Sequence, residues 1–230
     1  MPAARAAAGA AEGKAAGKAA GKAATGVATG AMPAGVRPAR EGQRRGEDFA
    51  DYCARRGAWV DGGGLREPPG YSQVEERAWP ALAEMNRAGL LTIDSQAAGS
   101  DTERAYVTGF MRPDRARALV RDLQLDSGFV AFRILSVPVR DPGDASGAPL
   151  PWESLPVTRN ERGFDTRLPL FQPKSSIRFL QAEAGLRASE DVVLLACVDP
   201  VWGRRAWGRR GLFAAVLAAL SAGGARSRVR

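Results

Sequence analysis

The first 45 residues restrict folding to the rest of the chain, because their apolar residues are almost all alanine. The tetrapeptide Gly-Lys-Ala-Ala occurs three times in succession over residues 13–24. Alanine favours helix, but each glycine costs about 1 kcal/mol, and alanine buries too little surface to offset the entropy of ordering. The sequence therefore predicts a disordered, low-complexity basic tail over residues 1–46, a folded domain over residues 47–222 and a basic tail over residues 223–230.

The N-terminal tail has two interpretations. It resembles the Ala/Lys-rich tails of linker histones, which would make it an electrostatic arm, and it also has the composition of a passive extension encoded by a GC-rich genome. It contains no run of large apolar residues that could act as a secretory signal, and its lack of serine argues against a transit peptide. We expect an intracellular protein, cytoplasmic or nuclear.

Most of the excess positive charge lies outside the predicted domain. The chain has a formal net charge of +8, and residues 1–45 hold eight basic and two acidic side chains. Residues 46–225 hold 22 basic and 23 acidic side chains, so this part is nearly neutral. Weak nucleic-acid binding through the tails is therefore one expectation, beside an unknown protein partner.

Several classes of enzyme are excluded by missing residues. The chain has no histidine, which removes Ser-His-Asp and Cys-His nucleophile systems and histidine metal sites. Its two cysteines can form neither a disulfide scaffold nor a four-thiolate zinc site. Because no glycine-rich phosphate-binding motif or nucleophile elbow is present either, we expect no cofactor.

Apolar periodicity and turn residues predict an α/β domain, with α+β as an alternative, built on one mixed sheet of four to six strands with packed helices. A capping box at residues 72–75 begins a helical pattern, and Pro80 either kinks that helix or starts a second one, with Gly89 after its end. Residues 175–186 fit a helix or a strand, and the proline-rich residues 138–160 predict an irregular loop. Further helices are expected at 113–123 and 212–220, and strands at 90–93, 104–111, 129–137, 168–171 and 192–198.

The last of these helices is too short to be a membrane span. Residues 211–224 form an apolar stretch of 14 residues, whereas about 20 are needed to cross a bilayer. We expect a core helix and no span.

Polar residues gather where the first predicted strand ends. If that strand and the strand at 192–198 are parallel neighbours, Asp94 and Asp199 share one rim of the sheet, and Glu103 joins them across a loop. Three carboxylates there would suit Mg²⁺ and a phosphate ester, whereas the structural alternative is that these residues cap loops and turns. The candidate polar site comprises Asn86, Thr92, Asp94, Ser95, Gln96, Glu103, Arg104, Tyr106 and Asp199.

A second candidate site is a repeated tetrapeptide, Trp-Gly-Arg-Arg, directly before the last helix. Tryptophan can stack on bases while guanidinium groups bind phosphates. The alternative is that the tryptophans are core residues and the arginines are solvated or paired. The candidate nucleic-acid residues are Trp202, Arg204, Arg205, Trp207, Arg209 and Arg210.

One block of the chain resembles a known family. Residues 85–96 read Met-Asn-Arg-Ala-Gly-Leu-Leu-Thr-Ile-Asp-Ser-Gln, and residues 103–111 read Glu-Arg-Ala-Tyr-Val-Thr-Gly-Phe-Met. Over residues 72–111 this pattern resembles a small uncharacterised domain found in actinobacteria and large DNA viruses. That family has no known activity, so the resemblance implies a recurring polar constellation but no catalytic role.

These observations favour an intracellular interaction or accessory module without catalysis, with a viral origin as one option that the resemblance offers. The first alternative is a nucleic-acid-associated protein that acts through its tails and the Trp202–Arg210 segment. The second is a metal-dependent phosphoester hydrolase that uses Asp94 and Asp199.

Overall fold

The computed structural model describes residues 42–62, 76–126, 128–137, 154–159 and 166–227. Most of the predicted N-terminal tail, the capping box at 72–75 and the larger part of the predicted loop at 138–160 lie outside the described residues.

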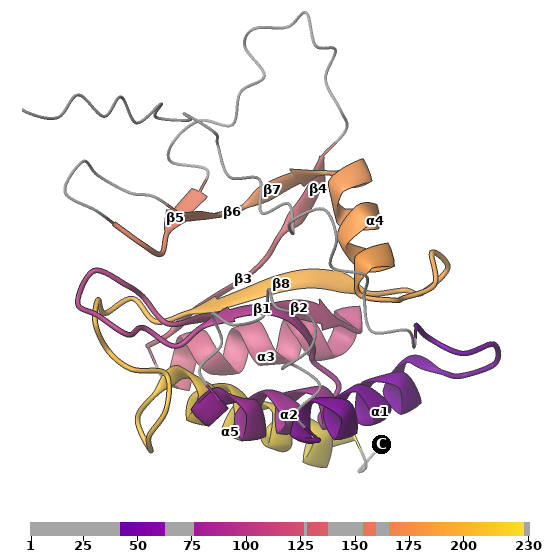
Figure 1. Ribbon diagram of the computed structural model, residues 1–230, viewed down its shortest axis with the longest axis horizontal. Helices are drawn as coiled ribbons and strands as arrows, with labels where there is room; N and C mark the ends of the chain where they lie inside the picture. Colours follow the sequence, from indigo (N-terminus) through magenta and orange to yellow (C-terminus); the bar gives the residue numbers. More distant parts are fainter. Residues whose placement is uncertain (1–41, 63–75, 127, 138–153, 160–165, 228–230) are drawn as a thin grey trace, which may run out of the picture. The chain divides into compact units, whose positions relative to one another are not determined.

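A four-stranded sheet forms the centre of the fold and confirms the predicted α/β class (Figure 1). Its strands are β1 (Leu91–Gln96), β2 (Tyr106–Met111), β8 (Val193–Val198) and β3 (Val130–Arg133), and the order across the sheet is β1-β2-β8-β3. Each neighbouring pair is antiparallel. Strand β8 was expected to be central because its residues are apolar without alternation, and it does lie between β2 and β3 with both faces covered.

Two smaller sheets lie beside it. Strand β4 (Leu135–Val137) pairs in parallel with β7 (Phe171–Pro173), and β5 (Ser154–Pro156) pairs antiparallel with β6 (Arg167–Pro169). The continuous strand predicted over 129–137 is therefore wrong, because the chain changes sheets at Ile134. The amide of Ile134 donates to Leu194 O in the main sheet, and the next amide donates to Leu170 O at the start of the β4–β7 pair. Strand β5 also lies inside the segment predicted to be irregular.

One helix starts at a proline that the sequence analysis singled out. Helix α2 (Trp79–Arg87) follows the short helix η2 (Glu76–Ala78) and has Pro80 in its first turn, so the second of the two alternatives for Pro80 is correct. Gly89 follows α2 with φ +87°, as a left-handed cap requires. The others are α1 (Phe49–Asp61), α3 (Pro113–Asp126), α4 (Lys174–Glu183) and α5 (Leu212–Ser227).

Helix α4 settles the ambiguous segment at 175–186, and α5 runs seven residues beyond its predicted end at Leu220. Within the part of the chain that the structure describes, no helix has the length and apolar character to cross a membrane.

Each face of the sheet has its own core. Helices α2, α3 and α5 cover one face, where Val107 and Met111 of β2 and Leu195 and Cys197 of β8 are buried. The opposite face buries Phe110 and Leu194 against residues from α1, α4 and the β5–β6 pair. Helix α1 contributes to both cores, because Phe49, Tyr52 and Cys53 lie in the second and Val60 lies in the first.

Helices α1 and α2 cross at a glycine. A Cβ at Gly57 would lie 2.6 Å from Ala83 O and 2.7 Å from Arg87 Cγ. A side chain therefore does not fit at this crossing unless the helices move apart, which is the physical reason for glycine in the middle of α1.

The first described residues bind a distant part of the chain, so the folded region begins before the predicted Glu47. The amide of Gln43 donates to Gly185 O at 2.8 Å, and its side chain donates to Glu190 Oε1 at 2.7 Å. In addition, Arg187 Nη2 donates to Glu47 O at 2.9 Å. We call these residues, 43, 47, 185, 187 and 190, the N-terminal clamp.

Candidate functional site

Strand β1 is longer than predicted, and this changes where Asp94 lies. The prediction ended the strand at Asp94, but pairing with β2 continues from Asp94, opposite Thr108, to Gln96, opposite Tyr106. A bulge between Thr92 and Asp94 shifts the register at this point. Asp94 therefore lies within an edge strand and not in a loop at the end of the sheet.

The predicted common rim of carboxylates does not form in the expected way. Strands β1 and β8 run in the same direction, but they are not neighbours, because β2 lies between them. Asp94, Glu103 and Asp199 each have a separate partner within the chain. Among the described residues, no three His, Cys, Asp or Glu side chains are close enough to hold a metal ion.

Asp94 pairs with a tyrosine on the face of the sheet opposite α2, α3 and α5. Tyr106 Oη donates to Asp94 Oδ2 at 2.9 Å, and Thr108 Oγ1 donates to the backbone oxygen of Asp94 at 3.4 Å. The Asp94 side chain keeps contact with solvent, but the protein around it removes part of its hydration and raises the pKa of the carboxyl, against the hydrogen bond from Tyr106. Burial raises the pKa of Tyr106, and Asp94 raises it further.

Asn86 and Thr92 have a structural role at the junction of α2 and β1. Asn86 Nδ2 donates to Thr92 Oγ1 and to Leu82 O, both at 2.7 Å. The amide of Thr92 donates back to Asn86 Oδ1 at 3.3 Å. Asn86 is fully buried and Ser95 nearly so, which places their side chains in the packed interior.

Gln96, Glu103 and Arg104 connect β1, the following loop and the segment near β5. Gln96 Nε2 donates to the backbone oxygens of Arg104 (3.0 Å) and Val157 (3.3 Å). Glu103 Oε2 accepts from the amide of Gly99, and its backbone forms an antiparallel bridge with Thr158. Apart from Asp199, the side chains of the predicted polar site therefore form three separate groups of contacts.

The segment Asp199–Gly211, which contains the repeated tetrapeptide, forms an ordered loop between β8 and α5. We call it the arginine loop. Glycines allow its turns, with φ +73° at Gly203 and +107° at Gly208. Its amides bind the rest of the fold: Asp199 donates to Ala105 O, Gly203 to Glu103 O and Ala206 to Ala97 O, at 2.8–3.0 Å.

Asp199 and Arg204 form a charged pair at the start of this loop. The Asp199 side chain is completely buried, and both its oxygens accept from Arg204, with Nη2 lying 2.6 Å from Oδ1. The amide of Val201 adds a bond to Oδ1 at 2.8 Å. This carboxylate is therefore occupied in holding the loop and is not free to bind a metal ion.

Trp202 does not have the free ring that base stacking would need. The guanidinium carbon of Arg104 lies 4.2 Å from its ring centroid, and that of Arg159 lies 4.6 Å from it. Burial lowers the pKa of Arg104, the positive charge of Arg159 lowers it further, and Asp199 acts in the opposite direction. Arginines therefore surround Trp202, but two of them already contact the ring on which a base would have to stack.

The other tryptophan and the remaining arginines of the loop differ in exposure. Trp207 is partly buried and packs against the first core, with Arg205 over its ring at 5.4 Å. Arg205, Arg209 and Arg210 are exposed, and no carboxylate among the described residues lies within ion-pair distance of them. Arg205 also donates to Gly99 O at 3.4 Å.

A model of a protein family, described as a domain of unknown function (DUF6919), matches residues 43–223. The chain belongs to the DUF6919 family. The resemblance to an uncharacterised domain family is confirmed at that level, and the match covers far more than residues 72–111. Comparison with curated proteins found no similar sequence.

Sequence reasoning missed part of what surrounds the arginine loop in this DUF6919 domain. Arg159, which lies over Trp202, falls in the predicted irregular loop. Phe129 lies against Arg204, whose guanidinium carbon is 4.8 Å from its ring centroid. Neither contact leaves a signal in sequence spacing, because the partners are more than 40 residues apart along the chain. The arginine loop itself was visible as a repeat.

Proposed function

We propose that the DUF6919 domain is an interaction module that binds single-stranded nucleic acid through its arginine loop and the two arginines beside it. The observation that supports this is the concentration of guanidinium groups around one loop, with few carboxylates beside them among the described residues. The arginines are Arg104, Arg159, Arg204, Arg205, Arg209 and Arg210. We call them the arginine surface.

The local charge favours a negatively charged partner. Among the residues that the structure describes, the acidic ones that contact this surface or its loop are Asp101, Glu103 and Asp199. Asp199 is neutralised by Arg204, and Glu103 accepts from the amide of Gly99. In the described part of the chain, six arginines against these three carboxylates leave an excess of positive charge, and phosphates of a nucleic-acid backbone would neutralise it with release of counterions.

The loop also has the rigidity that a binding site needs. Three of its amides are hydrogen-bonded to the backbone around β1 and β2, and Ala206 is fully buried. Because the backbone is fixed, fewer degrees of freedom are lost when the arginines bind a ligand. Since the rings of Trp202 and Trp207 contact the chain's own arginines, we expect backbone recognition with little preference for base sequence.

Fluorescence anisotropy with a labelled single-stranded oligonucleotide ending in 5′- and 3′-hydroxyl groups tests the proposal across a series of salt concentrations. The test variant is the double substitution Arg205→Gln/Arg209→Gln in the full chain. The matched control is Arg117→Gln/Arg178→Gln, which removes two exposed arginines from α3 and α4. All three proteins keep the basic N-terminal residues, so any contribution from them is the same in each.

We expect the test variant to bind more weakly and its log–log salt slope to be shallower by about 1.4, since each phosphate contact on a single strand contributes about 0.7. The control should bind like the wild type. The proposal is wrong if the wild type does not bind at low salt, or if the control loses as much affinity as the test variant.

A further inference from the structure

A cavity of about 290 Å³ lies where the arginine loop enters α5. Three of the residues that line it are arginines and none is acidic. They are Phe129, Arg204, Arg209, Arg210, Gly211 and Ala215. We infer that this cavity binds one phosphate monoester group and, resting on the proposed function, that the group is the terminal phosphate of a nucleic-acid strand.

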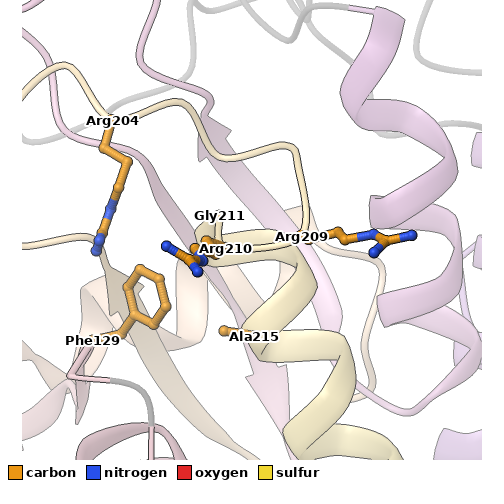
Figure 2. A pocket seen from close by; sticks show the side chains of 6 residues that line it. All are labelled: Phe129, Arg204, Arg209, Arg210, Gly211 and Ala215. Carbon is orange, nitrogen blue, oxygen red and sulfur yellow. The ribbon is translucent and has the colours of Figure 1, made fainter.

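Two of the three arginines converge in the cavity. Figure 2 shows Arg204 and Arg210 pointing toward the same space beside the ring of Phe129, whereas Arg209 points away from it. Asp199 already compensates the charge of Arg204, whereas Arg210 has no carboxylate partner among the described residues, and an anion between the two guanidinium groups would contact both.

Arg204 is oriented for such a contact before any ligand arrives. The buried carboxylate of Asp199 accepts from its Nε and Nη2 atoms, and the ring of Phe129 lies against the guanidinium. Its Nη1 atom has no hydrogen-bond partner among the residues that the structure describes. The pair with Asp199 therefore fixes the guanidinium group of Arg204 and leaves its Nη1 atom available to a phosphate oxygen.

The start of α5 adds a third source of positive potential. Helix α5 has 16 residues, and the cavity is lined by Gly211, directly before the helix, and by Ala215 near its start. The amides of Phe213 and Ala215 donate to Ala206 O and Gly211 O, whereas within the described chain those of Leu212 and Ala214 donate to no acceptor. The positive end of the helix dipole supports a negative charge placed here, in addition to the arginines.

The charge of the ligand favours a monoester over a diester. A phosphate monoester carries a charge of about −1.5 to −2 at pH 7, while each diester within a strand carries one negative charge. A terminal phosphate is also joined to the strand by one ester bond only. It can therefore enter a cavity that an internal phosphate, with the strand continuing on both sides, could not enter as easily. The arginine surface outside the cavity would bind the diesters that follow.

Three oligonucleotides of one sequence test this inference: one with a 5′-phosphate, one with a 3′-phosphate and one with hydroxyl groups at both ends. We expect the full chain to bind at least one phosphorylated form roughly tenfold more tightly than the form without a terminal phosphate. Arg210→Gln should abolish this ratio. Arg209→Gln is the matched control, because it removes the same charge from the preceding residue, whose side chain points away from the cavity (Figure 2).

The control should lower the affinity for all three oligonucleotides by the same factor and so preserve the ratio. Both substitutions are at exposed residues, and equal urea midpoints for the two variants would verify that both are folded. Equal wild-type affinity for all three oligonucleotides would overturn the inference and leave the proposed function intact. Loss of the ratio in both variants would overturn the assignment to Arg210.

Inorganic phosphate separates the two possible sources of the group. If no oligonucleotide binds, the proposed function is wrong, and calorimetric titration with phosphate, with sulfate at equal ionic strength as reference, still tests the cavity. Binding of phosphate that persists in Arg209→Gln and is lost in Arg210→Gln would support a free phosphate ligand. No heat of binding in the wild type would overturn the cavity as a phosphate site.

Discussion

Three acidic residues that were expected to act together have different neighbours, and the neighbours decide what each carboxylate does. Asp94 accepts from a tyrosine and keeps contact with solvent, whereas Asp199 has no exposed surface and binds an arginine. Glu103 accepts from a backbone amide. Asp199 is a structural group, because Arg204 and the amide of Val201 together offset the cost of removing its charge from water.

Removal of Arg204 should therefore destabilise the protein strongly. Arg204→Met leaves the Asp199 carboxylate buried without its cation, and because Arg204 is itself 38% exposed we expect a loss of about 2–3 kcal/mol in the free energy of unfolding. Urea denaturation of the two proteins measures it. Arg205→Met is the control, because this neighbouring arginine is exposed and has no ion-pair partner in the described part of the chain. An equal loss of unfolding free energy in both variants would contradict the structural role of the Asp199–Arg204 pair.

Glu47 should make stability depend on pH at the acidic end. Its hydrogen bond with Arg55, together with the nearby Arg44, lowers the pKa of Glu47 from 4.5 to about 2. A carboxyl with a lowered folded pKa contributes stability above pH 4.5 and loses it as the pH falls toward 2. Glu47→Gln should be less stable than the wild type at pH 7, and the gap between their urea midpoints should narrow between pH 4.5 and pH 3. A gap that is constant with pH would count against this explanation.

At the scale of elements, the sequence predicted what depends on local chemistry. Pro113 begins α3, Pro80 lies in the first turn of α2, and the apolar run at 192–198 is the buried strand β8. Predictions failed where a partner strand decides the outcome. Residues 129–137 have one continuous β pattern but pair with two different strands, and Asp94–Gln96 are polar but extended because β2 offers them partners.

The candidate site, too, was predicted where local sequence decides the structure and missed where distant contacts decide it. The repeated Trp-Gly-Arg-Arg sequence located the arginine loop, but spacing alone could not show that Arg104 and Arg159 occupy the Trp202 ring or that Phe129 lines the cavity. Those contacts join segments that are distant in sequence. They depend on the order of the strands in the sheet, which could not be predicted from the sequence.

The crossing of α1 and α2 gives a prediction about Gly57. In an isolated helix, Gly→Ala is favourable by about 1 kcal/mol, but at Gly57 the new Cβ would lie 2.6 Å from a backbone oxygen of α2. We expect Gly57→Ala to be destabilising by about 1–3 kcal/mol in thermal or urea unfolding, because the helices must separate.

Gly62→Ala is the matched control for this change. Gly62 follows the same helix at φ −73°, and a Cβ there would meet its nearest atoms at ordinary distances of 3.4 and 3.6 Å. Its unfolding free energy should be unchanged or slightly higher. A stable Gly57→Ala protein would show that the crossing is not close packed.

At the scale of the whole molecule, two cores on opposite faces share one sheet and one helix. Strands β2 and β8 place alternate residues in the two cores, and α1 contributes to both. Because neither core can lose its strands without exposing the other, we expect the two to unfold together.

The two cysteines provide the measurement, since Cys53 lies in one core and Cys197 in the other. Burial raises the pKa of each thiol to about 12, so neither should react with a thiol reagent at pH 8 in the folded protein. In increasing urea both should become labelled in one transition, with the labelled peptides assigned by mass spectrometry. Labelling of one thiol at a distinctly lower urea concentration would show that the cores unfold separately.

The N-terminal clamp has a practical consequence for anyone who prepares a shorter version of this protein. A cut chosen from the first regular element, Phe49, would discard Gln43 and Glu47 and leave Arg187 and Glu190 without hydrogen bonds that they form here. A version that starts at Gly42 keeps all of these bonds. We therefore expect expression yield and crystal quality to depend on a difference of only seven residues at the start of the recombinant chain.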